Sequence, residues 1–308
     1  MSAISVSGLT KKFGKFTAVN NLSFDVSENH VVGFLGLNGA GKTTTLRMLV
    51  GLSNPSAGKI EIAGRPMKFG KLGANKIIGY LPELPSMYHW MSGHEYLEFT
   101  AKLFKIPKQN RQTKIIELLN LVGLNDAKDK RIATYSGGMK QRLGIAQSLI
   151  NDPKVIILDE PVSALDPIGR KEVLEIIERL RKSRTVLFST HVLSDVDRIC
   201  DDVIIIDHGK LIASAPLSDL KSQYASQVIE VELSSNAEGI GKLINQQKWS
   251  KKVVQNGNEL KIWLSDESLV GNNTVLKFLI TQKVNVVRYG TVTPQTEDLF
   301  IHLIGESQ

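Results

Sequence analysis

The segment from His30 to Leu52 constrains the fold more than any other part of this 308-residue chain. It reads HVVGFLG, then the glycine-rich stretch LNGAGK, then TTTLRMLVGL. The apolar run is typical of a buried strand, and the periodic run that ends at Gly51 is typical of a helix. The turn between such a strand and helix lies at the N-terminus of the helix, which is its positive end and can bind an anion. The sequence therefore predicts an α/β core with a phosphate site at this turn.

The turn fits the phosphate-loop pattern G-x-x-x-x-G-K-[ST]. Glycines let backbone N–H groups curl around the β- and γ-phosphates without a Cβ in the way. Lys42 is expected to reach the terminal phosphates, and the Thr43 hydroxyl can ligate Mg²⁺. By chance, four fixed positions would recur about once in a hundred chains of this length, and the strand–turn–helix context lowers that further. The residues expected to hold ATP are Gly36, Asn38, Gly39, Ala40, Gly41, Lys42, Thr43 and Thr44.

Two acidic residues follow another apolar strand. The stretch VIILDEP places Asp159 and Glu160 at the carboxyl end of that strand, where α/β sheets bind ligands. Asp159 is expected to hold Mg²⁺ through water, and Glu160 to polarise the attacking water as a general base, a role worth roughly 10²–10⁴ in rate. A solvated turn with two acids is the alternative, and it would be favoured if this motif stood alone.

Patterning along the chain indicates two domains. Strands and turns dominate residues 1 to about 65, and three stretches with helical spacing form an insert over about 84–150. Strands then alternate with helices, which indicates parallel βαβ units. We expect a nucleotide-binding domain over residues 1–225, built as a P-loop NTPase core with an N-terminal antiparallel β region. A polar segment at 215–227, APLSDLKSQYASQ, is the expected linker to a small C-terminal α+β domain over 226–308.

Composition limits the class of protein. The net charge of +7 could serve nucleic acid, an anionic membrane face or an anionic substrate. The basic residues are scattered and aromatics make up 6%, so a solvated surface is favoured and no nucleic-acid partner is expected. The single cysteine, Cys200, cannot form an internal disulfide, which fits a cytosolic protein. No run approaches the roughly 18 apolar residues of a membrane span, and no signal peptide is visible.

The stretch YSGGMKQR, Tyr135–Arg142, points to a family. With the two motifs above, it resembles the ATP-binding cassette (ABC) family, whose signature is usually written LSGGQ. Ser136, Gly137 and Gly138 match, while the residues on either side of them depart from the consensus. A Ser-Gly-Gly turn before a helix is a second anion-binding terminus. The resemblance implies that this turn clamps the nucleotide held by the phosphate loop of a second subunit; a glycine-rich helix cap remains the alternative.

The resemblance implies further roles by position. Asp166, in the stretch SALD at 163–166, matches the loop that carries contact between the two sites. His191 matches the histidine that touches the γ-phosphate, with a helix-start residue as a nearly equal alternative. Phe13 matches the aromatic ring that stacks on adenine, with Phe16 as the fallback, and such stacking is worth about 1–3 kcal/mol. Either ring could instead be a core residue.

Glu83 departs from the family pattern. The family normally has Gln after a strand in the form GY-x-PQ, whereas this chain reads IIGYLPE. A Gln carbonyl can ligate Mg²⁺ while it stays neutral, and a carboxylate can ligate the metal but adds charge beside the phosphates. We hypothesise that Glu83 still ligates Mg²⁺ and that turnover survives.

Together these features imply an ATPase subunit of an ABC transporter. The resemblance predicts ATP and Mg²⁺ as cofactors, and as partners a second ATPase subunit that is expected to be identical and an integral membrane permease. It places this chain in the cytoplasm, peripheral on the inner face of the cell membrane. The ending TPQTEDLFIHLIG resembles the tail of exporter ATPases in the drug and antibiotic self-resistance branch. The alternatives are a non-transport cassette ATPase of the translation or DNA-maintenance type, and a regulatory binding module with incidental ATPase activity.

Overall fold

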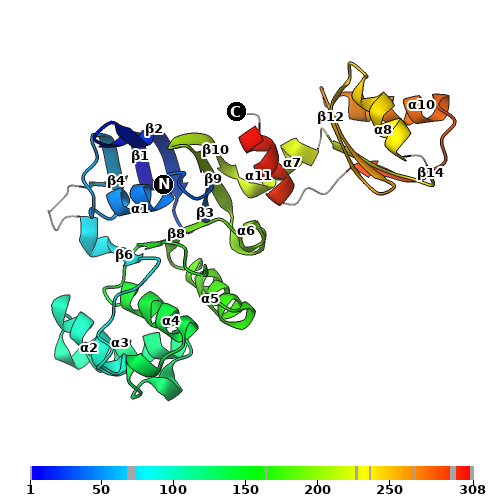
Figure 1. Ribbon diagram of the computed structural model, residues 1–308. Helices are drawn as coiled ribbons and strands as arrows, with labels where there is room; N and C mark the ends of the chain where they lie inside the picture. The colour runs from blue at the N-terminus through cyan, green and yellow to red at the C-terminus, as the bar shows by residue number, and fades with distance from the viewer. Residues whose placement is uncertain are drawn as a thin grey trace. The chain divides into compact units, whose positions relative to one another are not determined.

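The computed structural model describes residues 2–67, 74–163, 165–225, 228–235, 237–266, 268–291 and 296–305. The chain divides into two compact units, one of residues 1–216 with 303–308 and one of residues 217–302 (Figure 1). The first unit contains all the motifs that the sequence singles out, apart from the exporter-like tail.

An antiparallel sheet begins the first unit. Its strands follow the order β2-β1-β4-β5, and most of their side chains alternate between buried and exposed positions as expected for a sheet with one face on a core. Its members are β1 (Ser2–Phe13), β2 (Phe16–Ser27), β4 (Ala57–Ile62) and β5 (Arg65–Pro66). The predicted N-terminal antiparallel β region is therefore present.

A six-stranded sheet with the order β10-β9-β3-β8-β7-β6 forms the centre of this unit. Five of its strands pair in parallel, and β10 pairs antiparallel with β9 at one edge. The strands are β3 (Val31–Leu35), β6 (Ile78–Leu81), β7 (Val155–Leu158), β8 (Thr185–Thr190), β9 (Asp202–Asp207) and β10 (Lys210–Pro216). Every residue of β3, β7 and β8 is buried, which explains the unbroken apolar sequences of β3 and β7 and the apolar centre of β8.

Two apolar cores border the central sheet. One core joins the sheet to α1 (Lys42–Leu49) and to the antiparallel sheet. The other joins the sheet to α5 (Pro167–Leu180), α6 (Leu193–Ile199) and the helical insert. The partly buried Cys200 packs against this second core.

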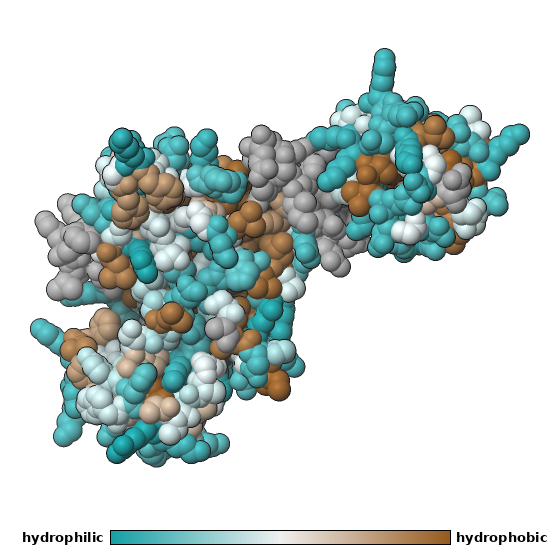
Figure 2. Space-filling view, viewed as in Figure 1, coloured by the Kyte–Doolittle hydropathy of each residue, from teal (hydrophilic) through white to brown (hydrophobic). Residues whose placement is uncertain are grey.

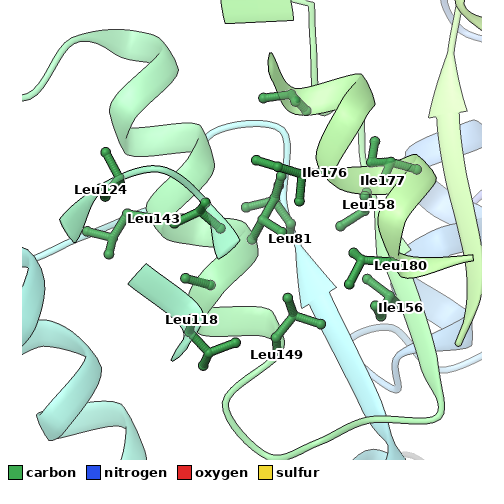
Figure 3. Packing of buried hydrophobic residues seen from close by; sticks show 14 of the residues in the cluster. Leu81, Leu118, Leu124, Leu143, Leu149, Ile156, Leu158, Ile176, Ile177 and Leu180 are labelled. Carbon is green, nitrogen blue, oxygen red and sulfur yellow. The ribbon is translucent and has the colours of Figure 1, made fainter. Parts of the chain in front are cut away.

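The helical insert lies between β6 and β7. It contains α2 (Gly93–Leu103), α3 (Lys108–Leu121) and α4 (Gly137–Ser148), with 3₁₀ turns at Asn125–Ala127 and Ile132–Thr134. Helix α2 starts with a capping box, in which Ser92 and Glu95 each satisfy a backbone N–H of the other. Leucines of α3 and α4 pack with Leu81, Leu158 and side chains of α5 in one cluster (Figure 3). The insert is thereby fixed to the central sheet through a shared apolar core.

The second unit is a four-stranded antiparallel sheet with helices. Its order is β12-β13-β11-β14, and its apolar side chains form a core with α8 and α10. The strands are β11 (Val228–Leu233), β12 (Ser250–Asn256), β13 (Glu259–Leu264) and β14 (Val286–Thr291), and the helices are α8 (Ala237–Asn245), α9 (Ser268–Gly271) and α10 (Thr274–Thr281). The chain continues into α11 (Thr296–Gly305). The small α+β domain expected from the sequence is therefore observed.

The segment expected to be the linker is largely helical. Residues 217–225 form α7 (Leu217–Ala225), and the division between the units falls at Pro216. Leu217 and Leu220 are spaced by three residues, which places both on one face of a helix, and Leu217 is buried. The polar composition of the segment concealed this short apolar face.

Within the described part of the chain, no helix combines the length and the apolar character that crossing a bilayer demands. Polar side chains cover most of the face seen in Figure 2, and apolar ones form patches between them.

Candidate nucleotide site

The loop between β3 and α1 has a backbone that its glycines make possible. Gly39 and Gly41 have positive φ angles of 84° and 102°, and Gly41 is the N-cap of α1. A Cβ at Gly41 would lie 2.6 Å from the Ala18 carbonyl oxygen, and a Cβ at Gly36 would lie 2.6 Å from that of Ile206. The loop therefore holds the phosphate-cradle conformation only with glycine at these positions.

The neighbouring residues divide between the tip and the base of the loop. Asn38 and Gly39 are exposed at the tip, Ala40 is buried, and Thr43 and Thr44 are half-buried in the first turn of α1. The loop predicted from the sequence is thus intact, with its exposed tip available to a phosphate.

A hairpin supports the loop from another direction. The Gly209 N–H, between β9 and β10, donates to the Ala40 carbonyl over 3.0 Å, and the Gly209 carbonyl accepts from the Asn20 N–H over 2.8 Å. Gly209 has a φ of 76°, and a Cβ there would lie 2.6 Å from the Ala18 oxygen. The loop is consequently bonded to the β9–β10 turn and, through that turn, linked to β2.

Lys42 points into the buried interior of the site. Its Nζ donates to the Gly36 carbonyl over 2.8 Å and lies 3.2 Å from Glu160 Oε1. The lysine side chain is only 7% exposed, so its charge is compensated by a carboxylate and a carbonyl at close range. This contact joins the phosphate loop to the acidic end of β7.

Asp159 gathers two hydroxyl groups. Its Oδ1 accepts from Thr43 Oγ1 over 3.1 Å and from Ser189 Oγ over 2.7 Å. Ser189 is not among the site residues predicted from the sequence, although it lies in the same FSTHVLSD stretch as His191. Its Oγ also accepts from the Glu160 N–H over 2.8 Å, so Ser189 fixes both acids at once.

Glu160 is held in an unusual backbone conformation. Its φ is 45°, in the left-handed region that costs a non-glycine residue about 1 kcal/mol or more. Its Oε2 lies 3.0 Å from His191 Nδ1, while its Oε1 faces Lys42. The structure therefore brings together three residues predicted separately from distant motifs: Lys42, Glu160 and His191.

Tyr80, in β6, lies beside these acids. Burial raises the pKa of the Tyr80 phenol above its usual range, and the negative charge of Asp159 raises it further. The nearby Arg47 opposes both effects by favouring the phenolate. The phenol therefore stays protonated at neutral pH.

The Ser-Gly-Gly turn has a different character. Ser136 is the N-cap of α4, and its Oγ accepts from the Met139 N–H over 3.2 Å. Ser136 and Gly137 are exposed, and a Cβ at Gly137 would meet nothing within 4 Å. The turn is thus an open helix terminus at the surface, as an anion-binding turn requires.

Asp166 caps a helix in this structure. Its Oδ1 accepts from the Gly169 N–H over 3.0 Å at the start of α5. One residue of the stretch 163–166 lies outside the described residues, and Ser163 Oγ donates to the Glu160 carbonyl over 3.2 Å. Asp166 therefore has a structural role that the sequence analysis did not assign to it.

The two aromatic candidates lie at the end of the β1–β2 hairpin. Phe13 and Phe16 pair across the strands and are 54% and 65% exposed. They are therefore not core residues. The Nζ of Lys11 lies 5.0 Å from the centre of the Phe13 ring, a cation–π arrangement that distinguishes Phe13 from Phe16.

Glu83 lies two residues beyond the end of β6. Because Leu81 of β6 pairs with Leu158 of β7, Glu83 and Asp159 follow adjacent parallel strands at the same edge of the sheet. Glu83 is exposed and makes no hydrogen bond or ion pair with any described residue. The structure thus does not join Glu83 to Thr43 and Asp159.

The residues near the loop fit a magnesium ion held together with a nucleotide. Thr43 and Asp159 offer hydroxyl and carboxylate oxygens, the ligands that Mg²⁺ prefers. Among the described residues, no group of three or more His, Cys, Asp and Glu side chains could hold a metal by itself. Such a site relies on phosphate oxygens and water for its remaining ligands.

Two families match the chain. The family described as ABC transporter matches residues 19–163, which contain the phosphate loop, the Ser-Gly-Gly turn and both acids. The family described as ATP-binding protein DrrA1-3-like, C-terminal domain, matches residues 216–304. The two matches follow the division of the chain into two units.

Similar proteins share this organisation over their whole length. The uncharacterised ABC transporter ATP-binding protein YxlF of Bacillus subtilis (strain 168) is 42% identical over 98% of this chain and 99% of its own. The bacitracin transport ATP-binding protein BcrA of Bacillus licheniformis is 36% identical over 98% of this chain and 97% of its own. A solved ATP-binding subunit of an ABC transporter superposes with a TM-score of 0.66 at 29% identity, covering 72% of this chain and 93% of that subunit. The chain therefore belongs to the ATP-binding subunits of ABC transporters, and it is an ATPase that serves transport rather than translation or DNA maintenance.

Proposed function

We propose that two copies of this chain bind two ATP molecules between them and drive an exporter at the inner face of the cell membrane. The observation that carries this proposal is the contrast between two parts of the molecule: the buried Lys42–Glu160 pair, which His191 contacts from an exposed position, and the exposed Ser136–Gly137 turn. The cluster of Lys42, Glu160 and His191 can act on a nucleotide bound in the same subunit. The exposed turn is an anion site that faces solvent, where a second subunit can present its triphosphate.

The phosphate loop binds the nucleotide. The backbone N–H groups of Gly39 to Lys42 surround the β- and γ-phosphates, and the Lys42 ammonium exchanges its Glu160 contact for a phosphate oxygen. Thr43 and Asp159 would hold Mg²⁺, which neutralises charge on the phosphates when it is bound. The neighbouring position of Glu83 at the sheet edge makes it a candidate for an outer ligand. Phe13 stacks on adenine because its ring is exposed at the hairpin end.

Glu160 acts as the general base. Its carboxylate orients water for in-line attack on the γ-phosphate, and Ser189 fixes its backbone in the strained conformation that aims it. His191 lies 3.0 Å from the same carboxylate and contacts the γ-phosphate. Ser136, Gly137 and Gly138 of the second subunit clamp that phosphate, and Asp166 lies where the two sites meet.

The partners follow from the relatives. ABC transporter ATP-binding subunits work with membrane components, and a relative named for bacitracin transport extends over the full length of this chain. We take the permease to be a separate integral membrane protein and the substrate to leave the cell. The exporter-like tail of the second unit supports this direction.

Replacing Glu160 with Gln tests the proposal. Glu160→Gln removes the base but keeps the shape and hydrogen bonds of the side chain, so ATP binds and hydrolysis falls by roughly 10²–10⁴. The nucleotide then persists between two subunits, and light scattering with Mg-ATP gives twice the monomer mass. Glu178→Gln, which changes an exposed acid of α5, is the matched control and stays monomeric and active. A Glu160→Gln protein that remains monomeric at saturating ATP would contradict the dimer, and one that hydrolyses ATP at the wild-type rate would contradict the base.

A further inference from the structure

Helix α5 is tied to both of its neighbours by arginine pairs. On one side, Arg142 of α4 places Nη2 3.5 Å from Glu172 Oε2. On the other side, Arg170 donates from Nε to Asp195 Oδ1 over 2.8 Å and from Nη2 to Ser194 Oγ over 3.1 Å. Side-chain contacts therefore link α4 to α5 and α5 to α6 across the face of the central sheet.

The Arg170–Asp195 pair is the more buried of these links. Asp195 is 3% exposed, and its Oδ2 is buried without a hydrogen-bond partner among the described residues. Burial raises the pKa of the Asp195 carboxyl, and the guanidinium of Arg170 opposes that shift. Only the Oδ1 atom of Asp195 accepts a hydrogen bond from a described residue. The position of Asp195 therefore depends on Arg170 more than it would if both carboxylate oxygens were hydrogen-bonded.

The two ends of this link lie at different parts of the nucleotide site. Asp195 is in the first turn of α6, four residues after His191, which contacts Glu160. Arg170 follows Gly169, and a Cβ at Gly138 of the Ser-Gly-Gly turn would lie 3.7 Å from the Gly169 Cα. One short path through α6 and α5 thus joins the γ-phosphate end of the site to the start of α4.

We propose that Arg170 is a positioning residue that couples the two halves of the nucleotide site inside one subunit. A nucleotide on the Lys42 loop moves or fixes His191, and Arg170 transmits this to Ser136–Gly138, which act on the nucleotide of the second subunit. This inference rests on the proposed function, because it requires two subunits that share two nucleotides. It adds that each subunit reports the state of its own site to the other through rigid packed helices.

Mixed dimers isolate this coupling. In each dimer one subunit, the reporter, keeps its Glu160 and hydrolyses ATP. The other, the silent subunit, carries either Glu160→Gln, which keeps ATP on its loop, or Lys42→Ala, which prevents binding. Differently tagged subunits are joined by a peptide linker and purified on both tags. The ratio of the two hydrolysis rates at saturating Mg-ATP measures how strongly the silent subunit's nucleotide assists its own Ser136–Gly138 turn.

Arg170→Met is then placed in the silent subunit. The rate ratio is expected to fall by roughly 2- to 30-fold toward one, which is the range of such couplings. The same change in the reporter leaves the ratio within about twofold, because the reporter's own turn faces the silent nucleotide. Arg170→Lys in the silent subunit restores part of the ratio, because a lysine can still reach Asp195.

Two further variants separate coupling from stability. Arg181→Met breaks the tie between the other ends of the same two helices, where Arg181 Nε lies 3.3 Å from Asp201 Oδ2, and it leaves the ratio unchanged. Arg170→Met with Asp195→Leu removes both members of the ion pair and leaves no buried carboxylate without its partner, so the fold is retained while the ratio still falls. The coupling would be overturned if the ratio stayed unchanged both for Arg170→Met and for Arg170→Met with Asp195→Leu in the silent subunit. It would also be overturned if Arg170→Met lowered the ratio equally in the silent subunit and in the reporter. Neither result would affect dimer formation by Glu160→Gln, which tests the proposed function.

Discussion

The Lys42 loop and the Ser136 turn are both helix N-termini built from glycines, yet they differ in almost every other respect. The loop is bonded to the distant β9–β10 turn and, through Lys42 and Thr43, to two buried acids. The turn lies at the surface, and among the described residues its serine bonds only within its own helix. The difference shows that one half of a nucleotide site can be completed by intramolecular contacts, while the other half gains its ligand only from outside the subunit.

The largest expected effect is a difference between alanine substitutions at two glycines, one in each half of the nucleotide site. Gly41→Ala places a Cβ 2.6 Å from the Ala18 oxygen at a φ of 102°, so it should destabilise the fold by more than about 2 kcal/mol and abolish ATP binding. Gly137→Ala meets no atom within 4 Å and lies at the first position of α4, so the melting temperature should not fall. Thermal unfolding and binding of a fluorescent ATP analogue check both variants. Equal losses of stability would remove the distinction between the halves.

An added charge at the turn should have the next largest effect. Ser136→Asp keeps a side chain that can cap α4, so the free energy of unfolding should change by less than about 0.5 kcal/mol. The new carboxylate faces the position expected for the second subunit's triphosphate, so ATPase activity should fall at least about tenfold through lost electrostatic stabilisation. Ser136→Asn, a cap without charge, is the control and should retain more activity. Full activity in Ser136→Asp would show that no phosphate approaches this turn.

The smallest expected loss of ATPase activity tests how the buried half is held. Ser189→Ala removes a donor to Asp159 and leaves the buried Glu160 N–H without its acceptor, which should cost about 1–3 kcal/mol of stability. ATPase activity should fall through kcat more than through KM, because Glu160 loses its aim while Lys42 keeps its contacts. Ser163→Ala, which removes a hydroxyl near the same acid, is the comparison. A KM effect alone would show that Ser189 supports nucleotide binding instead of the base.

Much of the buried half could be predicted from the sequence because its chemistry depends on local spacing. The glycines, Lys42 and Thr43 lie within one loop, and the acids follow a strand directly. Ser189 was missed because its role comes from the pairing of β7 with β8. Leu158 pairs with Phe188, so the next residues of both strands meet at the sheet edge. Nothing in the local sequence Ser-Thr-His indicates this register between β7 and β8.

Other features also depend on tertiary contacts. The Arg170–Asp195 link joins two helices whose separation in space cannot be read from either helix alone. The capping role of Asp166 was hidden because the family resemblance offered a role in the nucleotide site first. Helix α7 was missed because local polarity outweighed a spacing of only two leucines. The fold class and the presence of a second domain were predicted correctly because long strand–helix alternation is a strong pattern.

The bond from Gly209 to Ala40 sets a practical lower limit on the length of a working ATPase fragment. The last recognisable motif ends near His191, so a truncation guided by motifs could stop soon after it. Such a fragment would lack β9 and β10, whose connecting turn supports the phosphate loop through the Gly209–Ala40 hydrogen bond. A fragment that ends after Pro216 retains this support. The β9–β10 hairpin is therefore part of the nucleotide site although it carries no motif of its own.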